Sequence, residues 1–108
     1  MEKPKLLSVR QDILYEKELT LSAKLILQNL INMQVLGNGN NPQCTIEHFE
    51  RKFGIEERYA ASAITELLRK GYIYDYCARR KNQYGNMVYE WGLDTGRINE
   101  DFTGAIYD

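Results

Sequence analysis

The chain is poor in the residues that most often build metal and disulfide sites. Its 108 residues contain one histidine, His48, and two cysteines, Cys44 and Cys77. These residues fall short of the four ligands of a structural zinc site, and two cysteines do not make a disulfide framework. We therefore expect no metal and no cofactor. Both cysteines are expected to be buried thiols, because free cysteine packs as a small hydrophobic residue.

Catalytic arrangements are equally scarce. No nucleophile and base lie at a spacing that supports covalent catalysis, and a single histidine leaves little for proton transfer near neutral pH. The glycine-containing turn at 37–39 lacks the preceding strand and the downstream residues of a phosphate-binding loop. The sequence therefore predicts a protein that is not an enzyme.

A long apolar run and a strong net charge are also missing. No segment could span a bilayer or serve as a signal peptide, so we expect no membrane contact and a cytoplasmic location. The net charge is −1, whereas nucleic-acid-binding domains often carry a basic excess. The charge is uneven, because residues 1–93 are slightly basic and residues 94–108 set Arg97 against Asp94, Glu100, Asp101 and Asp108. The acidity is thus concentrated in the tail.

Apolar side chains recur at three- and four-residue spacing in three segments, which predicts helices over residues 21–36, 46–53 and 57–70. Thr20 and Thr45 are suited to cap the first two helices. The third helix has two faces, and its inward face is expected to hold Ala60, Ala61, Ile64, Leu67 and Leu68. Its outward face holds polar and charged residues at spacings of four, three and four.

The spacing changes from helical to alternating at Gly71, which is expected to end the third helix. Residues 72–79 and 87–93 alternate as two strands, and a basic turn near 80–86 joins them. A short strand at 43–44 is also expected. Helix, turn, helix and hairpin in this order predict a winged helix-turn-helix, an α+β and mostly α fold with a three-helix core and a C-terminal β-hairpin wing.

Three short motifs carry a resemblance to a known family. They are Leu-Thr-Leu-Ser-Ala-Lys-Leu at 19–25, Phe-Gly-Ile at 53–55, and Ile-x-x-Leu-x-x-x-Gly-Tyr-Ile at 64–73. In these motifs the chain resembles the winged-helix domains of bacterial and phage replication-initiator (replisome-organiser) proteins and related small regulators. The resemblance covers about half of the chain. It implies a DNA-binding protein of transcription regulation or DNA replication in a phage or another mobile element.

The candidate DNA-binding residues lie in two groups. On the outward face of the third helix are Arg58, Tyr59, Ser62, Thr65 and Arg69, and in the wing are Arg79, Arg80 and Lys81. Arginine can bridge the acceptors of a guanine edge, and hydroxyls can contact phosphates or bases. The first hypothesis is therefore sequence-dependent binding of double-stranded DNA. Helix 57–70 would enter the major groove and the wing at 80–86 would lie on the backbone, with a homodimer on two half-sites as the usual arrangement.

The second hypothesis is a winged-helix protein-interaction module, an adaptor or inhibitor that does not read DNA. Glu56 and Glu57 lie at the start of helix 57–70, the helix that would enter the major groove. Carboxylates at this position suit the helix dipole but repel phosphates. Tyr72, Tyr74 and Tyr76 alternate along the first strand and are expected to share one face, as tyrosines at partner surfaces often do. An equal alternative is that this row packs beneath the N-terminal segment or the tail.

The expected organisation has one domain. Residues 1–93 form the winged helix-turn-helix domain, with residues 1–18 as an N-terminal cover segment, and residues 94–108 form an acidic C-terminal tail. The tail is either a second cover segment or a loose extension. Leu25 and Leu36 fall away from the apolar stripe of the first helix, and they are either covered by the N-terminal segment or part of a dimer interface.

Overall fold

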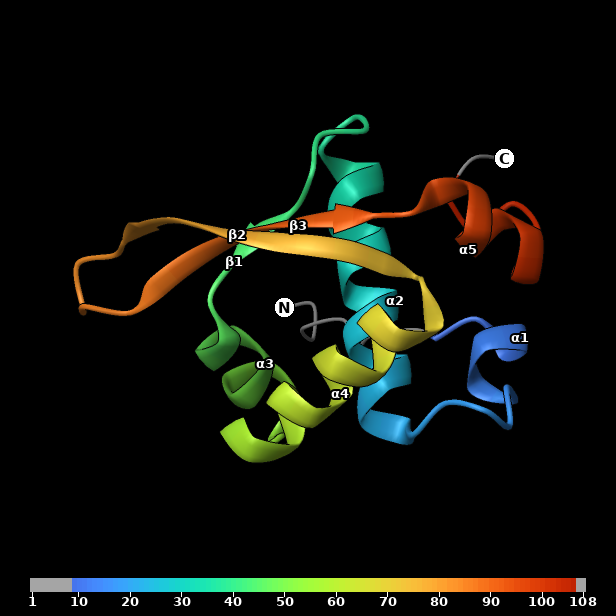
Figure 1. The fold of residues 1–108 in the computed structure, drawn as a ribbon, viewed down its shortest axis with the longest axis horizontal. Helices are drawn as coiled ribbons and strands as arrows, with labels where there is room; N and C mark the ends of the chain where they lie inside the picture. The colour runs from blue at the N-terminus through green and yellow to red at the C-terminus, as the bar shows by residue number, and fades with distance from the viewer. Residues whose placement is uncertain (1–8, 107–108) are drawn as a thin grey trace, which may run out of the picture.

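A computed structural model of the chain describes residues 9–106. Its elements are α1 (Gln11–Leu14), α2 (Leu21–Leu36), β1 (Gln43–Cys44), α3 (Ile46–Phe53), α4 (Glu57–Lys70), β2 (Ile73–Lys81), β3 (Met87–Leu93) and α5 (Thr95–Asp101). Helices α3 and α4 lie on one side of a small sheet, and α2 runs past its strands (Figure 1). The β2–β3 hairpin projects from one end of the molecule, and α1 and α5 lie at the other end (Figure 1). The protein is thus a small α+β domain with an antiparallel sheet.

The three predicted helices coincide with α2, α3 and α4, and local chemistry explains their bounds. The hydroxyl of Thr20 accepts a hydrogen bond from the amide of Ala23, and the hydroxyl of Thr45 accepts one from the amide of His48. Each threonine thereby satisfies an amide that the first turn leaves unpaired. Gly54 and Gly71 end α3 and α4 with φ of 70° and 83°, a left-handed conformation that favours glycine.

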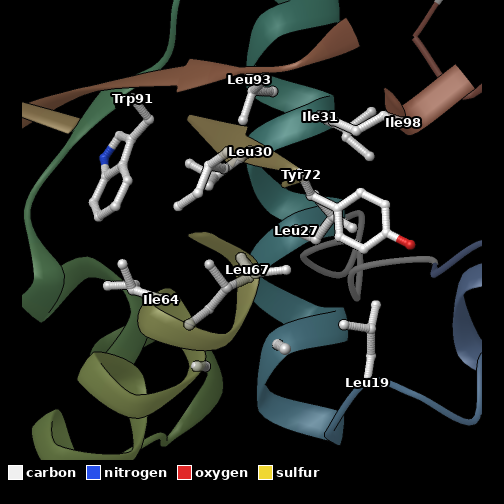
Figure 2. Packing of buried hydrophobic residues seen from close by; sticks show 14 of the residues in the cluster. Leu19, Leu27, Leu30, Ile31, Ile64, Leu67, Tyr72, Trp91, Leu93 and Ile98 are labelled. Carbon is white, nitrogen blue, oxygen red and sulfur yellow. The ribbon is translucent and has the colours of Figure 1, made fainter. Parts of the chain in front are cut away.

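The core lies between α2, α4 and the sheet. Leu27, Leu30, Leu67 and Trp91 are fully buried there (Figure 2). On α4 the buried alanines are Ala60 and Ala63, whereas Ala61 is exposed, so the prediction that Ala61 faces inward was wrong. Ala63 lies three residues after Ala60 and four before Leu67, which places it on the buried stripe. Ala61 lies outside that stripe.

The sheet has the strand order β1-β3-β2, with both pairings antiparallel. The predicted short strand at 43–44 is β1. The register of β2 against β3 shifts twice, between Ile73 and Asp75 and between Ala78 and Arg80. Each shift is a bulge that places one extra residue, Tyr74 or Arg79, on β2. Strict alternation along β2 is therefore interrupted at both ends of its central segment.

The segment after β3 packs onto the core. Helix α5 and the turns after it bury Ile98, Phe102 and Ile106, and Phe102 lies 5.6 Å from Tyr72 between ring centroids. Near the other end of the described chain, α1 buries Ile13. The guanidinium of Arg10 donates a hydrogen bond of 2.9 Å to the carbonyl of Thr103. Residues 94–106 therefore act as a cover, the first of the two alternatives for the tail.

The two cysteines differ in their environment. Cys44 is buried, and burial raises the pKa of its thiol to about 12. Cys77 is exposed, so the prediction of two buried thiols was wrong for this residue. The reason is that Cys77 lies on the outer face of an edge strand, where no helix of the described chain covers it.

Candidate nucleic-acid interface

Helix α4 exposes the predicted face. Arg58, Tyr59, Ser62, Thr65 and Arg69 are all exposed, while Ala60, Ala63, Ile64 and Leu67 on the other side are buried. The packing of the buried side chains against α2 and α3 fixes the rotation of the helix. All five candidate side chains of α4 therefore reach solvent on one side of the domain.

Local contacts constrain only part of this face. The guanidinium of Arg58 lies 4.7 Å from the ring centroid of Tyr59 and 3.5 Å from the carboxylate of Glu56. Thr65 donates a hydrogen bond of 3.1 Å to the carbonyl of Ala61. Within residues 9–106, Arg69 has no ion pair and the hydroxyl of Ser62 has no hydrogen-bond partner. An exposed pair such as Arg58 and Glu56 is worth little, so Arg58 can exchange partners at low cost.

The β2–β3 hairpin, the predicted wing, presents three exposed cations. Arg79 lies 3.5 Å from the carboxylate of Glu90, and Arg80 donates a hydrogen bond of 3.0 Å to the side chain of Gln43. Lys81 is exposed and has no ion pair within the described chain. The hairpin extends beyond α3, away from the body of the domain (Figure 1). These cations therefore lie on a projecting element.

The turn of the wing has a defined conformation. The side-chain oxygen of Asn82 accepts hydrogen bonds from the amides of Tyr84 and Asn86, at 2.9 Å and 3.0 Å. Gly85 adopts φ of 84°, a value that most residues avoid. Tyr84 is 74% exposed at the tip. The fixed turn places this ring in solvent, where it can contact a ligand.

Sequence reasoning missed two basic candidates. Arg51 and Lys52 are exposed in the last turn of α3, the helix that precedes the turn into α4. Their signal was a pair of adjacent cations at a helix end, a position that also suits the helix dipole. They add positive charge on the side of the sheet that carries α4.

Carboxylates lie in the same region. Glu50, Glu56 and Glu57 are exposed on α3 and at the start of α4. Glu66 is engaged elsewhere, because its carboxylate accepts hydrogen bonds of 2.9 Å and 2.7 Å from the amide and the hydroxyl of Thr20. That contact ties α4 to the start of α2. The exposed surface of α3 and α4 is therefore mixed in charge.

The predicted tyrosine row does not exist. Tyr72 is only 4% exposed and lies beneath α5. Tyr74, at the first bulge, is 62% exposed and its ring lies across Gly92. Tyr76 stacks on Trp91 with ring centroids 4.8 Å apart. The bulge at Tyr74 breaks the alternation, so the three rings occupy three different environments.

Metal-ligating side chains are not gathered anywhere in the described part of the chain. Between residues 9 and 106, no group of three or more His, Cys, Asp and Glu side chains is placed to hold a metal ion. His48 is half-buried, and its Nε2 lies 3.0 Å from the side-chain oxygen of Asn29. Burial, with smaller contributions from Lys52 and Arg51, lowers the pKa of His48. No helix in the same stretch of chain has both the length and the apolar character to cross a membrane.

Comparison with known proteins gives no relative. No protein-family model, no curated protein and no solved structure matches the chain. The candidate interface therefore rests on the geometry of its own residues.

Proposed function

We propose that this protein is a winged helix-turn-helix protein that binds double-stranded DNA in a sequence-dependent manner. The proposal includes a role in transcription regulation or in replication of a phage or another mobile element. The single observation that carries it is the outward face of α4. Arg58, Ser62, Thr65 and Arg69 are all exposed on one side of this helix, and the core does not use them.

The order and placement of the elements support this assignment. A short helix, a tight turn at Gly54 and a second helix precede a hairpin that projects from the body. In such an arrangement the second helix enters the major groove and the hairpin contacts an adjoining groove or phosphate row. Arg58 and Arg69 suit guanine edges or phosphates, and Arg79, Arg80 and Lys81 suit the backbone.

The test is selection from a pool of random duplexes at two salt concentrations. We expect an enriched motif and an affinity that falls as salt rises, because cations of the protein displace counterions from phosphates. The matched control is Lys17→Ala, which removes an exposed cation in the segment between α1 and α2, outside α4 and the β2–β3 hairpin. This variant should bind as the wild type does. Equal recovery of all sequences, or no recovery at low salt, would contradict the proposal.

A second candidate function is a protein-interaction module of the same fold. The observation that favours it is the pair of exposed carboxylates, Glu56 and Glu57, at the start of α4. Carboxylates at that position repel a phosphate backbone and would suit a basic protein partner. Failure of every duplex to bind at low salt would favour this second function.

A further inference from the structure

The edge strand β2 has a central segment whose backbone is open to solvent. The sheet order is β1-β3-β2, so among residues 9–106 β2 has a neighbouring strand on one side only. The central segment, 75–78, pairs with β3 without interruption, and a bulge lies at each end of it, at Tyr74 and Arg79. An open edge of this kind is a template for pairing with another strand.

The register shows which backbone groups point outward. The amide of Trp91 donates to the carbonyl of Pro42 at 2.9 Å, so Trp91 points its backbone groups away from β2. Backbone groups alternate in direction along an antiparallel strand. Tyr76 is opposite Trp91, Cys77 is opposite Glu90, and Ala78 is opposite Tyr89.

Cys77 therefore exchanges hydrogen bonds with β3, whereas the amide and carbonyl groups of Tyr76 and Ala78 point towards the open edge. Within residues 9–106, no side chain or backbone group bonds to these outward groups. The edge thus offers one donor and one acceptor on each side of Cys77, from Tyr76 and from Ala78.

The side chains around Cys77 are self-complementary. Antiparallel pairing of two β2 strands with Cys77 opposite Cys77 sets Asp75 opposite Arg79 of the second copy, and Tyr74 opposite Arg80. The bulges at Tyr74 and Arg79 lie three residues before and two residues after Cys77, so they bound the regularly paired segment of each copy without facing each other. Asp75 and Arg79 both lie on the outer face of the sheet, as their contacts with Cys77 and Glu90 show. Opposite charges at directly opposed positions stabilise strand pairing.

We propose that the partner of this edge is a second copy of the chain, joined by antiparallel β2–β2 pairing with the symmetry axis at Cys77. Tyr76 of each copy exchanges two hydrogen bonds with Ala78 of the other. Two Asp75–Arg79 pairs flank this centre, and Arg80 lies near the ring of Tyr74 of the second copy. The surface involved is small, so the dimer is expected to be weak. This inference does not rest on DNA binding.

The first test is a charge exchange followed by sedimentation over a wide range of protein concentration. Asp75→Arg and Arg79→Asp each place like charges opposite one another at two positions. Each should weaken dimerisation by roughly twofold to thirtyfold, from the usual strength of cross-strand pairs. The double variant Asp75→Arg/Arg79→Asp should recover the wild-type dissociation constant. Circular dichroism would establish that all variants keep the fold.

The second test is disulfide trapping with diamide, which accepts two electrons and two protons from two thiols and leaves one S–S bond. In the proposed register the two Cys77 residues oppose each other at a non-hydrogen-bonded position, where side chains lie close enough for a disulfide bond. Cys44 does not compete, because burial raises the pKa of its thiol to about 12. We expect a Cys77–Cys77 dimer that forms rapidly.

The matched control is Cys77→Ser/Lys81→Cys, which keeps Asp75 and Arg79 and moves the thiol along the same exposed strand. The two thiols at position 81 would lie about 27 Å apart in the proposed register. This variant should dimerise by sedimentation as the wild type does, but diamide should trap little of it. Three results would overturn the proposal: trapping at position 81 as fast as at 77, single charge variants that dimerise as well as the wild type, or a monomer at all concentrations.

Discussion

The phenol of Tyr72 donates a hydrogen bond of 2.6 Å to the carboxylate of Asp101, and this bond joins the start of β2 to the end of α5. Arg97 completes the contact. Its guanidinium donates to the same carboxylate at 3.0 Å and lies 5.1 Å from the centroid of the Tyr72 ring. Together these residues hold α5 against the core at the point where α4 passes into the sheet.

Removing this bond should loosen α5. Tyr72→Phe keeps the ring against Phe102 and deletes the hydroxyl, so we expect the free energy of unfolding to fall by about 0.5–1.5 kcal/mol. The lower part of this range is expected because Asp101 lies at the surface, where solvent screens the contact. Urea denaturation measures the change. Tyr74→Phe is the control, since its hydroxyl has no partner within the described chain, and an equal loss in the control would contradict the assignment.

The same contact should be visible in the ionisation of Tyr72. Burial, the hydrogen bond to Asp101 and the charge of Asp101 together raise the pKa of Tyr72 to about 12. Asp101→Asn removes the negative charge, and we expect the pKa of Tyr72 to fall towards its usual value. Ultraviolet absorbance of tyrosinate would follow the titration. A pKa unchanged by this substitution would mean that burial alone accounts for the shift.

Leu67 tests the packing of α4. Its side chain is fully buried between α4 and α2, so Leu67→Ala should cost about 2–5 kcal/mol. Against a total stability of about 5–15 kcal/mol for a domain, this loss should lower the thermal midpoint strongly. Leu36→Ala is the matched control, because Leu36 is 83% exposed. Equal thermal midpoints for the two variants in calorimetry would contradict the burial of Leu67, and with it the observed rotation of α4 about its own axis.

His48 should make stability depend on pH. Burial lowers the pKa of His48 in the folded protein below its ordinary value of 6.5. Because the unfolded chain then binds the proton more readily, stability is complete above pH 6.5 and is lost as the pH falls through 6.5 towards the folded pKa. Thermal midpoints measured between neutral and mildly acidic pH should therefore fall in the wild type. His48→Gln should flatten this dependence, and an equally steep fall in the variant would assign the effect to other groups.

Arg58 and Arg80 should contribute differently if the protein binds DNA. Arg58→Ala should cost roughly 1–3 kcal/mol on the preferred site and relax the preference at one base pair. Arg80→Ala should weaken all duplexes alike and reduce the salt dependence by about one ion. Titration of fluorescent duplexes at several salt concentrations separates the two effects. Identical behaviour of both variants would contradict the assignment of base contacts to α4 and backbone contacts to the wing.

Glu57 offers a test of opposite sign. Glu57→Lys replaces an exposed negative charge at the start of α4 with a positive one. Non-specific affinity for duplex DNA should therefore rise, because phosphate attraction is largely electrostatic. Lys17→Glu, which changes an exposed charge in the segment between α1 and α2, should have a smaller effect in the opposite direction.

Local sequence patterns determined the helices and the ends of the hairpin, because those features depend on neighbouring residues. Thr20 and Thr45 cap α2 and α3, and Gly71 ends α4, as the sequence predicted. The spacing of apolar residues also gave Ala60, Ile64 and Leu67 of the buried stripe of α4, but it included Ala61 wrongly and missed Ala63. The candidate cations and hydroxyls are exposed as expected, and their role in binding DNA stays a prediction.

Features that depend on tertiary contacts were not predictable in the same way. A bulge such as the one at Tyr74 leaves no mark in the alternation of residue types, so the tyrosine row was inferred from a regular strand that does not exist. The burial of Tyr72 depends on α5, which comes more than twenty residues later in the chain. Cys77 is exposed because β2 lies at an edge of the sheet. The order of strands in a sheet cannot be predicted from the residues of one strand.

The wing has a consequence for local unfolding. Within the described residues, β3 is flanked on both sides only from Tyr89 to Trp91, because β1 pairs with Tyr89 and Glu90 and the carbonyl of Pro42 accepts from the amide of Trp91. Beyond that point the hairpin is two-stranded, and two strands without a covering layer are marginal by themselves. Its amide hydrogens should therefore exchange with solvent at a free energy well below that of global unfolding. The wing can thus change shape around a ligand while the core of the domain stays folded.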